Sequence, residues 1–206
     1  MDQRIAKHSF KVTAAISISR VLGFIRDMLV AQVFGAGFAA DAFYAAFRLP
    51  NLFRRLFGEG AFSAAYIPTF SENLHTKSKD SAVYFYRVVT LALFFVLVAV
   101  AVLGIIFARQ ITAFVAFGFQ STGGKLELAT TLTQILFPYL VFVCLAALAM
   151  GTLNALQVFF VPALSSAMLN IVEVGYLILA YYLYKPSIIG LAYAAVLGGL
   201  GQYLIQ

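Results

Sequence analysis

Long stretches without a charged residue constrain this chain more than any other feature. Residues 88–108 form one such stretch of twenty-one residues, and residues 128–172 form another of forty-five. A helix rises about 1.5 Å per residue, so about 20 apolar residues cross the ~30 Å hydrocarbon core of a bilayer. The two stretches therefore predict one membrane crossing over 88–108 and two over 128–172. A further uncharged stretch follows Lys185 and predicts one more crossing.

The composition excludes a soluble fold. Hydrophobic residues make up 63% of the 206 residues and charged residues only 11%, with a mean hydropathy of +0.94. Soluble chains have about 45–50% hydrophobic residues and about 25% charged residues. We attribute the net charge of +6 to cytoplasmic loops and to charges inside the membrane, not to a nucleic-acid partner. The sequence has no nucleotide-binding loop, metal-ligand cluster or nucleophile triad, so we expect no enzyme, metal or cofactor.

We predict an all-α polytopic membrane protein in which six transmembrane helices form one bundle over residues 1–206. A glycine-containing turn (FGAGFAA) and a polar break (NALQVFFVP) separate neighbouring helices. The second helix would be about 45 Å long, so we expect it to tilt, protrude or kink at Pro50. The predicted helices span 12–34, 41–70, 84–108, 130–155, 160–184 and 187–206.

Basic residues divide unevenly between the two sides of such a bundle. Lys and Arg concentrate in cytoplasmic loops, so we expect both termini in the cytoplasm. The six basic residues on the terminal side are Arg4, Lys7, Lys11, Lys77, Lys79 and Arg87, and the three on the opposite side are Arg109, Lys125 and Lys185.

The first two predicted helices carry charges that cannot all face lipid, although Arg48 and Arg55 can reach the headgroup layer. An arginine at a helix centre costs roughly 2.5–3.5 kcal/mol on insertion. Five arginines face three carboxylates in this region, which leaves an excess of two positive charges. The arginines are Arg20, Arg26, Arg48, Arg54 and Arg55, and the acidic residues are Asp27, Asp41 and Glu59.

Two interpretations of these charges remain open. In the first, they are ion pairs that fix the packing of the first two helices, with Arg55 and Glu59 paired one turn apart. In the second, the excess charge lines a hydrated cavity for an anion, and guanidinium groups suit phosphate oxygens. Helical spacing places Asp27 on the same polar flank as Arg20, and Asn51 on the same face as Arg55.

Glu173 stands apart, with no basic residue within eleven positions along the chain. It is either a neutral packing residue of the bundle interior or an ion or proton site. Asn154 and Asn170 are expected to form hydrogen bonds between helices.

The motifs SRVLGFIRD (19–27) and FGAGFAADAFYAAFRLPNLFRRLFGEGAFSAAYIP (34–68) closely resemble the MurJ/MviN family of lipid II flippases. The later stretches FPYL (137–140) and GTLNALQVFFVPALSSAMLN (151–170) resemble the same family. The resemblance implies a member of the multidrug/oligosaccharidyl-lipid/polysaccharide exporter superfamily, with two six-helix lobes around a central cavity. It implies cavity roles for Ser19, Arg20, Arg26 and Arg54, and functional importance for Asp41 and Glu59. It carries no role over to Glu173.

The resemblance also implies a function. We expect the chain to be the N-terminal lobe of a lipid II flippase of the bacterial inner membrane, with the second lobe absent from this chain. Such a protein turns undecaprenyl-diphosphate-linked disaccharide-pentapeptide from the cytoplasmic to the outer leaflet by alternating access. Its partners are lipid II, membrane lipids and, as further candidates, peptidoglycan synthases. Two alternatives stay open: a flippase for another prenyl-diphosphate glycan, and a non-transporting scaffold that binds the lipid-linked precursor.

Overall fold

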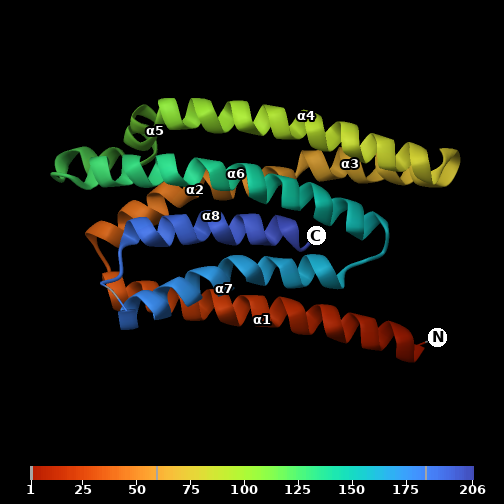
Figure 1. Ribbon diagram of the computed structural model, residues 1–206, viewed down its shortest axis with the longest axis horizontal. Helices are drawn as coiled ribbons and strands as arrows, with labels where there is room; N and C mark the ends of the chain where they lie inside the picture. The colour runs from red at the N-terminus through yellow and green to blue at the C-terminus, as the bar shows by residue number, and fades with distance from the viewer. Residues whose placement is uncertain (1, 59, 184) are drawn as a thin grey trace.

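The computed structural model describes residues 2–58, 60–183 and 185–206; the side chains of residues 2–11, 57, 58 and 61 lie outside the description. Every regular element in these ranges is helical (Figure 1), which confirms the all-α prediction. The elements are α1 (Asp2–Phe34), α2 (Phe38–Gly58), α3 (Ala61–Glu72), the π-helical turn η1 (Asn73–Lys77), α4 (Lys79–Ile106), α5 (Ala108–Val115), the 3-10 turn η2 (Phe117–Ser121), α6 (Lys125–Ala155), α7 (Phe160–Leu183) and α8 (Ile188–Leu204).

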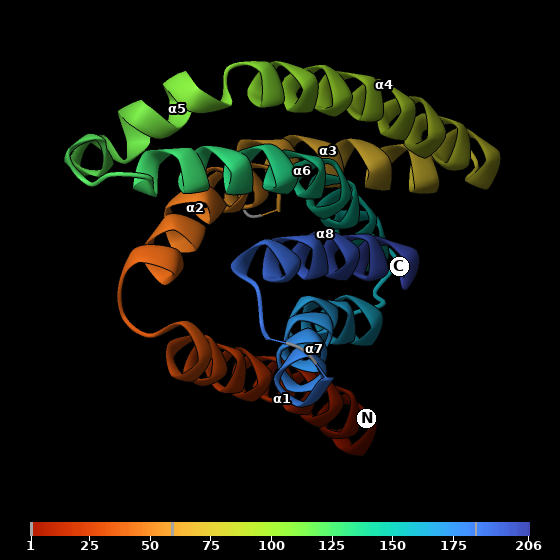
Figure 2. The same ribbon diagram turned by 60° about the vertical axis from the view of Figure 1, so that its left-hand side comes forward.

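The helices pack in an order that differs from their order in the chain. α1 lies along α7, α2 lies along α6, and α8 packs against both α6 and α7. α4 and α5 cover the outer side of α6, as Figures 1 and 2 show. α1 and α2 follow each other through a short connection in which Gly35 has a φ of 70°, yet they contact each other little. The first two helices therefore belong to different parts of the bundle: α1 lies beside α7, and α2 lies beside α6.

Two glycines allow α8 to approach both of its neighbours closely. A Cβ atom at Gly199 would lie 2.4 Å from the ring of Tyr139 on α6, and one at Gly198 would lie 2.9 Å from Cα of Leu169 on α7. Small residues at helix contacts let backbones come together in membrane proteins. This contact fixes the distance between α6 and α7 near the site described below.

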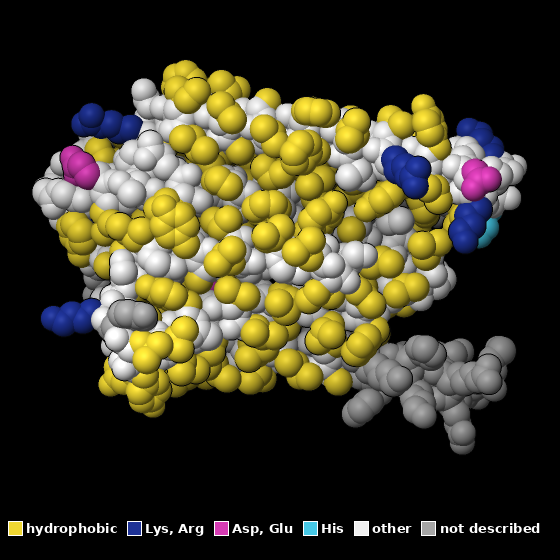
Figure 3. Space-filling view, in the orientation of Figure 1, with side chains coloured by type: hydrophobic (Ala, Val, Ile, Leu, Met, Phe, Trp, Pro, Cys, Tyr) yellow, Lys and Arg dark blue, Asp and Glu magenta, His cyan; other side chains and the backbone are white. Residues whose placement is uncertain are grey.

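Three described helices are long and apolar enough to cross a membrane: Lys79–Ile106, Lys125–Ala155 and Phe160–Leu183. Ile188–Leu204 is shorter but also apolar. On the face shown in Figure 3, the lysines and arginines gather near the two ends of the molecule, and hydrophobic side chains cover the surface between them. This is the surface of a multi-pass membrane protein, in which the apolar band meets lipid and the charged ends meet water.

The single helix expected over 41–70 is two helices, α2 and α3, and this part of the prediction is wrong. α2 continues through Pro50, where the kink was expected, and the division falls between Gly58 and Ala61. Gly60 has an extended backbone (φ −103°, ψ −154°) and starts α3. The glycines at 58 and 60 each cost about 1 kcal/mol relative to alanine in a helix. Proline costs more, about 3 kcal/mol, but membrane helices tolerate it where neighbouring groups satisfy the freed backbone.

Two short elements, α5 and η2, were not expected between the spans. The hydroxyl groups of Thr112 on α5 and Thr133 on α6 are 3.0 Å apart and hydrogen-bonded. Both threonines are buried, so the bond holds α5 against the end of α6.

Candidate functional site

A cavity of about 340 Å³ lies where α1 and α7 face α2 and α6. Its polar lining comes from four helices, while Phe43, Phe47, Tyr139 and Leu169 supply most of its apolar surface. The rings of Phe47 and Tyr139 are 5.2 Å apart and join the α2 wall to α6. The polar lining residues are Arg26 from α1, Tyr44, Asn51 and Arg54 from α2, Ser166, Asn170 and Glu173 from α7, and Gln202 from α8.

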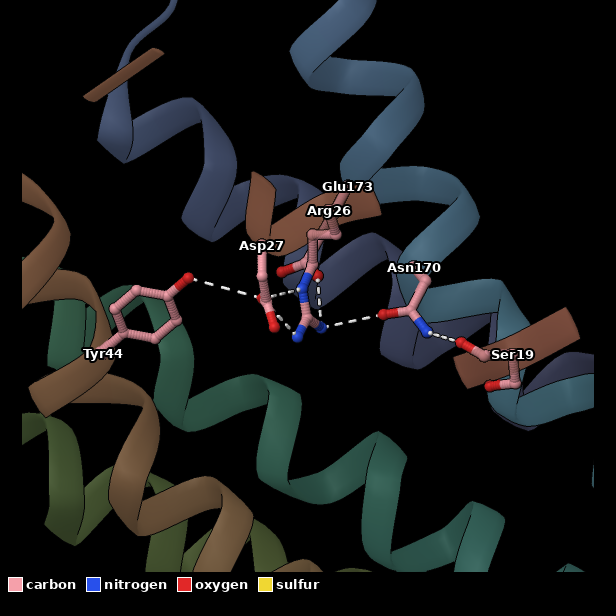
Figure 4. Close-up of polar contacts among 6 residues, drawn as sticks. All are labelled: Ser19, Arg26, Asp27, Tyr44, Asn170 and Glu173. Carbon is pink, nitrogen blue, oxygen red and sulfur yellow. Dashed lines mark hydrogen bonds and ion pairs between the residues drawn. The ribbon is translucent and has the colours of Figure 1, made fainter. Parts of the chain in front are cut away.

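Arg26 is the centre of a polar network in this cavity (Figure 4). Its Nε and Nη2 atoms donate to Oδ1 of Asp27 over 3.0 and 2.9 Å. Its Nη1 atom donates to Oδ1 of Asn170 over 2.9 Å and to Oε2 of Glu173 over 3.2 Å. The two carboxylates therefore hold opposite edges of one guanidinium group.

The two carboxylates differ sharply in their access to solvent. The side chain of Asp27 is 53% exposed, whereas that of Glu173 is 1% exposed. A buried carboxylate needs a cation or hydrogen-bond donors to offset its lost hydration. Arg26 supplies this partner for Glu173, and the ion pair joins α1 to α7.

Asn170 connects the guanidinium to the backbone of α1. Its Nδ2 atom donates to the carbonyl oxygen of Ser19 over 3.0 Å, and its Oδ1 atom accepts from Arg26. One turn away, the hydroxyl of Ser166 donates to the hydroxyl of Ser19 over 3.1 Å. A Cβ atom at Gly23 would already touch Asn170 at 3.5 Å, so a larger residue at position 23 would compete with Asn170 for its place.

The opposite wall of the cavity carries Arg54. Its Nε atom donates to Oδ1 of Asn51 over 3.0 Å, which orients the guanidinium along α2. Tyr44, also on α2, extends across to α1, where its hydroxyl donates to Oδ1 of Asp27 over 3.5 Å. Guanidinium groups thus reach one cavity from two helices that hardly contact each other. These groups suit an anion, and no group of three or more His, Cys, Asp or Glu that could hold a metal ion occurs within the described part of the chain.

The other candidate residues lie elsewhere. Arg20 and Arg55 are exposed and do not line this cavity, and Ser19 lies beside it through its contacts with Ser166 and Asn170. Glu59, and with it the expected Arg55–Glu59 pair, lies outside the described residues. 

Asp41 has a partner of its own. Its Oδ2 atom accepts from Nζ of Lys125 over 2.7 Å, which joins the start of α2 to the start of α6. It borders a second depression of about 310 Å³ together with Tyr44, Arg48 and the residues 115–119.

Sequence reasoning missed the partner of Glu173, which comes from 147 positions earlier in the chain. With Glu173 and Lys125, the partner of Asp41, both counted, six basic residues face four carboxylates, and the excess of two positive charges is unchanged. The sequence does contain a signal that Glu173 belongs to a polar face. Ser166, Asn170 and Glu173 are spaced by four and three residues, which places them on one face of an otherwise apolar helix.

Comparison with known proteins agrees with this architecture. A family model described as "Lipid II flippase MurJ" matches residues 30–206. A protein of Buchnera aphidicola subsp. Schizaphis graminum, named "Probable lipid II flippase MurJ", is 40% identical over 202 residues, or 98% of this chain and 39% of its own length. The "Lipid II flippase MurJ" of Burkholderia cenocepacia is 39% identical over 92% of this chain and 37% of its own length.

A solved structure described as "Lipid II flippase MurJ, inward closed conformation" superimposes with a TM-score of 0.79 and 30% identity, over 94% of this chain and 40% of that one. The chain thus spans about two fifths of the length of the curated relatives it matches. The match of the family model over most of the chain, the level of identity and the shared fold all lead to one assignment: the chain belongs to the lipid II flippase MurJ family.

Proposed function

We propose that this chain forms one wall of the route by which a flippase moves lipid II from the cytoplasmic to the outer leaflet of the bacterial inner membrane. The observation that carries the proposal is the placement of Arg26 and Arg54 on facing walls of one cavity. The names of the relatives support the same substrate. Both termini of the chain would lie in the cytoplasm, as the distribution of basic residues favours.

The size of the cavity limits which part of the substrate it can hold. A volume of about 340 Å³ lies at the lower end of the ~300–1,000 Å³ typical of ligand pockets. It suits a diphosphate, whose oxygens can accept from both guanidinium groups. The sugar and peptide would extend beyond this cavity, and the prenyl tail would remain in lipid.

Transport requires the site to open to one side of the membrane and then to the other. Within this chain α8 packs against both α6 and α7 and holds the two walls of the cavity together, so the chain would move as one lobe against the second lobe of the full-length protein. Rocking of membrane-protein units about a central site exposes the site to one side and then the other. No bond of the substrate breaks in this process, so the protein acts as a transporter, and peptidoglycan synthases would receive its product.

The proposal is tested with the full-length protein in liposomes. Lipid II carrying a fluorescent headgroup is placed in one leaflet, and its appearance in the other leaflet is followed by quenching. We expect protein-dependent translocation of lipid II and little translocation of the matching prenyl monophosphate lipid. Binding of lipid II without translocation would instead favour a scaffold. Equal translocation of both lipids would contradict recognition of the diphosphate.

A further inference from the structure

Glu173 is a carboxylate in the wall of a cavity whose arginines suit an anion. Its side chain is 1% exposed and accepts from Nη1 of Arg26. On charge alone it should repel a phosphate group and weaken binding. Its position therefore calls for a role other than attraction of the ligand.

Arg26 has two edges, and each is held differently. A guanidinium group has five N–H donors, and four of them are used here: one from Nε and one from Nη2 to Asp27, and two from Nη1 to Asn170 and Glu173. One N–H of Nη2 remains for a ligand. Two-point binding of a phosphate therefore requires Arg26 to release at least one of its present partners.

Exposure decides which partner leaves. Asp27 is 53% exposed, so water can solvate its carboxylate once Arg26 has turned to a ligand. Glu173 has no such access, and losing its only ion-pair partner in the described residues would leave a buried charge uncompensated. Asn170, which is also buried, holds the same edge and is itself tied to the backbone of α1.

We propose that Glu173, together with Asn170, is a positioning residue that clamps the Nη1 edge of Arg26 so that the Nε/Nη2 edge alone exchanges Asp27 for two oxygens of a diphosphate. The proposal rests on the proposed function and adds how the site chooses its ligand. The clamp fixes the plane of the guanidinium, and a fixed plane favours two-point over one-point phosphate contacts. A single phosphate group can occupy this edge, but only a diphosphate offers a second phosphate to Arg54 across the same cavity. By keeping Arg26 in place for this shared contact, Glu173 raises selectivity for a diphosphate while its charge lowers attraction for anions in general.

The test compares two lipids that differ by one phosphate. Farnesyl diphosphate and farnesyl monophosphate are titrated into the full-length protein in detergent, and the ratio of their dissociation constants is measured. We expect wild type to prefer the diphosphate by about tenfold, and Glu173→Ala to reduce this preference by about fivefold, which is the net contribution of one ordinary hydrogen bond. Glu173→Gln keeps an acceptor for Nη1 and should retain most of the preference. Glu127→Ala, which removes an exposed glutamate at the start of α6, is the matched control and should change nothing.

A second measurement does not depend on any ligand. Phenylglyoxal labels arginine side chains, and mass spectrometry reports the rate at Arg26 and at Arg54. Without the clamp, Arg26 should be labelled at least threefold faster in Glu173→Ala, with the Arg54 rate unchanged.

The outcomes separate this inference from the proposed function. If Glu173→Ala binds both lipids more tightly with an unchanged ratio, Glu173 acts only through its charge and the clamp is wrong. An unchanged labelling rate at Arg26 also overturns the clamp. If wild type binds neither lipid but Arg26 is labelled faster in Glu173→Ala, the proposed function fails while the clamp stands.

Discussion

Nη1 of Arg26 on α1 lies 3.2 Å from Oε2 of Glu173 on α7, and this ion pair joins the first helix to a helix that follows it by more than a hundred residues. The pair does not involve α2, although α2 follows α1 directly in the chain. It therefore holds α1 on one side of the cavity, while Arg54 remains on the other. The pair and the α2 wall with Arg54 are linked through α8, which packs against both α7 and α6.

The first prediction concerns the stability of this pair. Arg26→Ala leaves the buried Glu173 without its cation, so we expect a loss of about 3–5 kcal/mol in stability. The loss should appear as reduced abundance and a lower Tm in detergent. Adding Glu173→Gln to the same chain should restore much of both, because the stranded charge is then gone.

Arg20→Ala provides the control for this experiment, since it removes an exposed arginine from the same helix. It should leave abundance and Tm close to wild type. Arg26→Ala with unchanged abundance and Tm would show that Glu173 does not depend on Arg26.

The second prediction concerns the approach of α8 to α6. A Cβ atom at Gly199 would lie 2.4 Å from Tyr139, so Gly199→Ala forces either the ring or the helix to shift, at a cost of about 1–3 kcal/mol. Gly175→Ala is the matched control, because a Cβ atom there meets nothing within 4 Å in α7. We expect Gly175→Ala to be neutral or to stabilise by up to ~1 kcal/mol through helix propensity. The Tm of each variant is measured by thermal unfolding in detergent. Equal Tm values for the two variants would argue against the close contact between Gly199 and Tyr139.

The third prediction concerns topology. A cysteine at Ser78 should react with a membrane-impermeant maleimide only from the cytoplasmic side, and one at Gly123 only from the outside. Both positions are exposed, and the native Cys144 is buried and should stay unlabelled. The reverse pattern would overturn the orientation derived from the loop charges.

Much of the fold could be predicted because its signal is local. Uncharged stretches of the length of a bilayer crossing identify α4, α6, α7 and α8 without knowledge of their neighbours. The division between α2 and α3 also has a local signal, in the glycines at 58 and 60, whereas α2 continues through Pro50. A proline in a membrane helix is tolerated when neighbouring groups satisfy the freed backbone.

The site was harder to predict because its contacts depend on which helices pack together. Helical spacing identified the polar flank that carries Arg26 and Asp27. It did not reveal that α1 lies along α7, so the contacts of Arg26 with Glu173 and Asn170 could not be predicted from the sequence. The pairing of Asp41 with Lys125, 84 positions apart, was missed for the same reason.

The central claim is that Arg26 and Arg54 bind the diphosphate together, and lipid II translocation per molecule of full-length protein tests it most directly. The variants are Arg54→Ala, Arg54→Lys and the double variant Arg26→Ala with Glu173→Gln, which avoids a stranded carboxylate. We predict that Arg54→Ala and the double variant lose about 100-fold or more in rate, as removal of one preorganised hydrogen-bond donor does elsewhere, at near-normal abundance. Arg54→Lys should recover only part of the rate, because an ammonium group keeps the charge and loses the two-point contact. Wild-type translocation per molecule in Arg54→Ala and in the double variant would contradict the account.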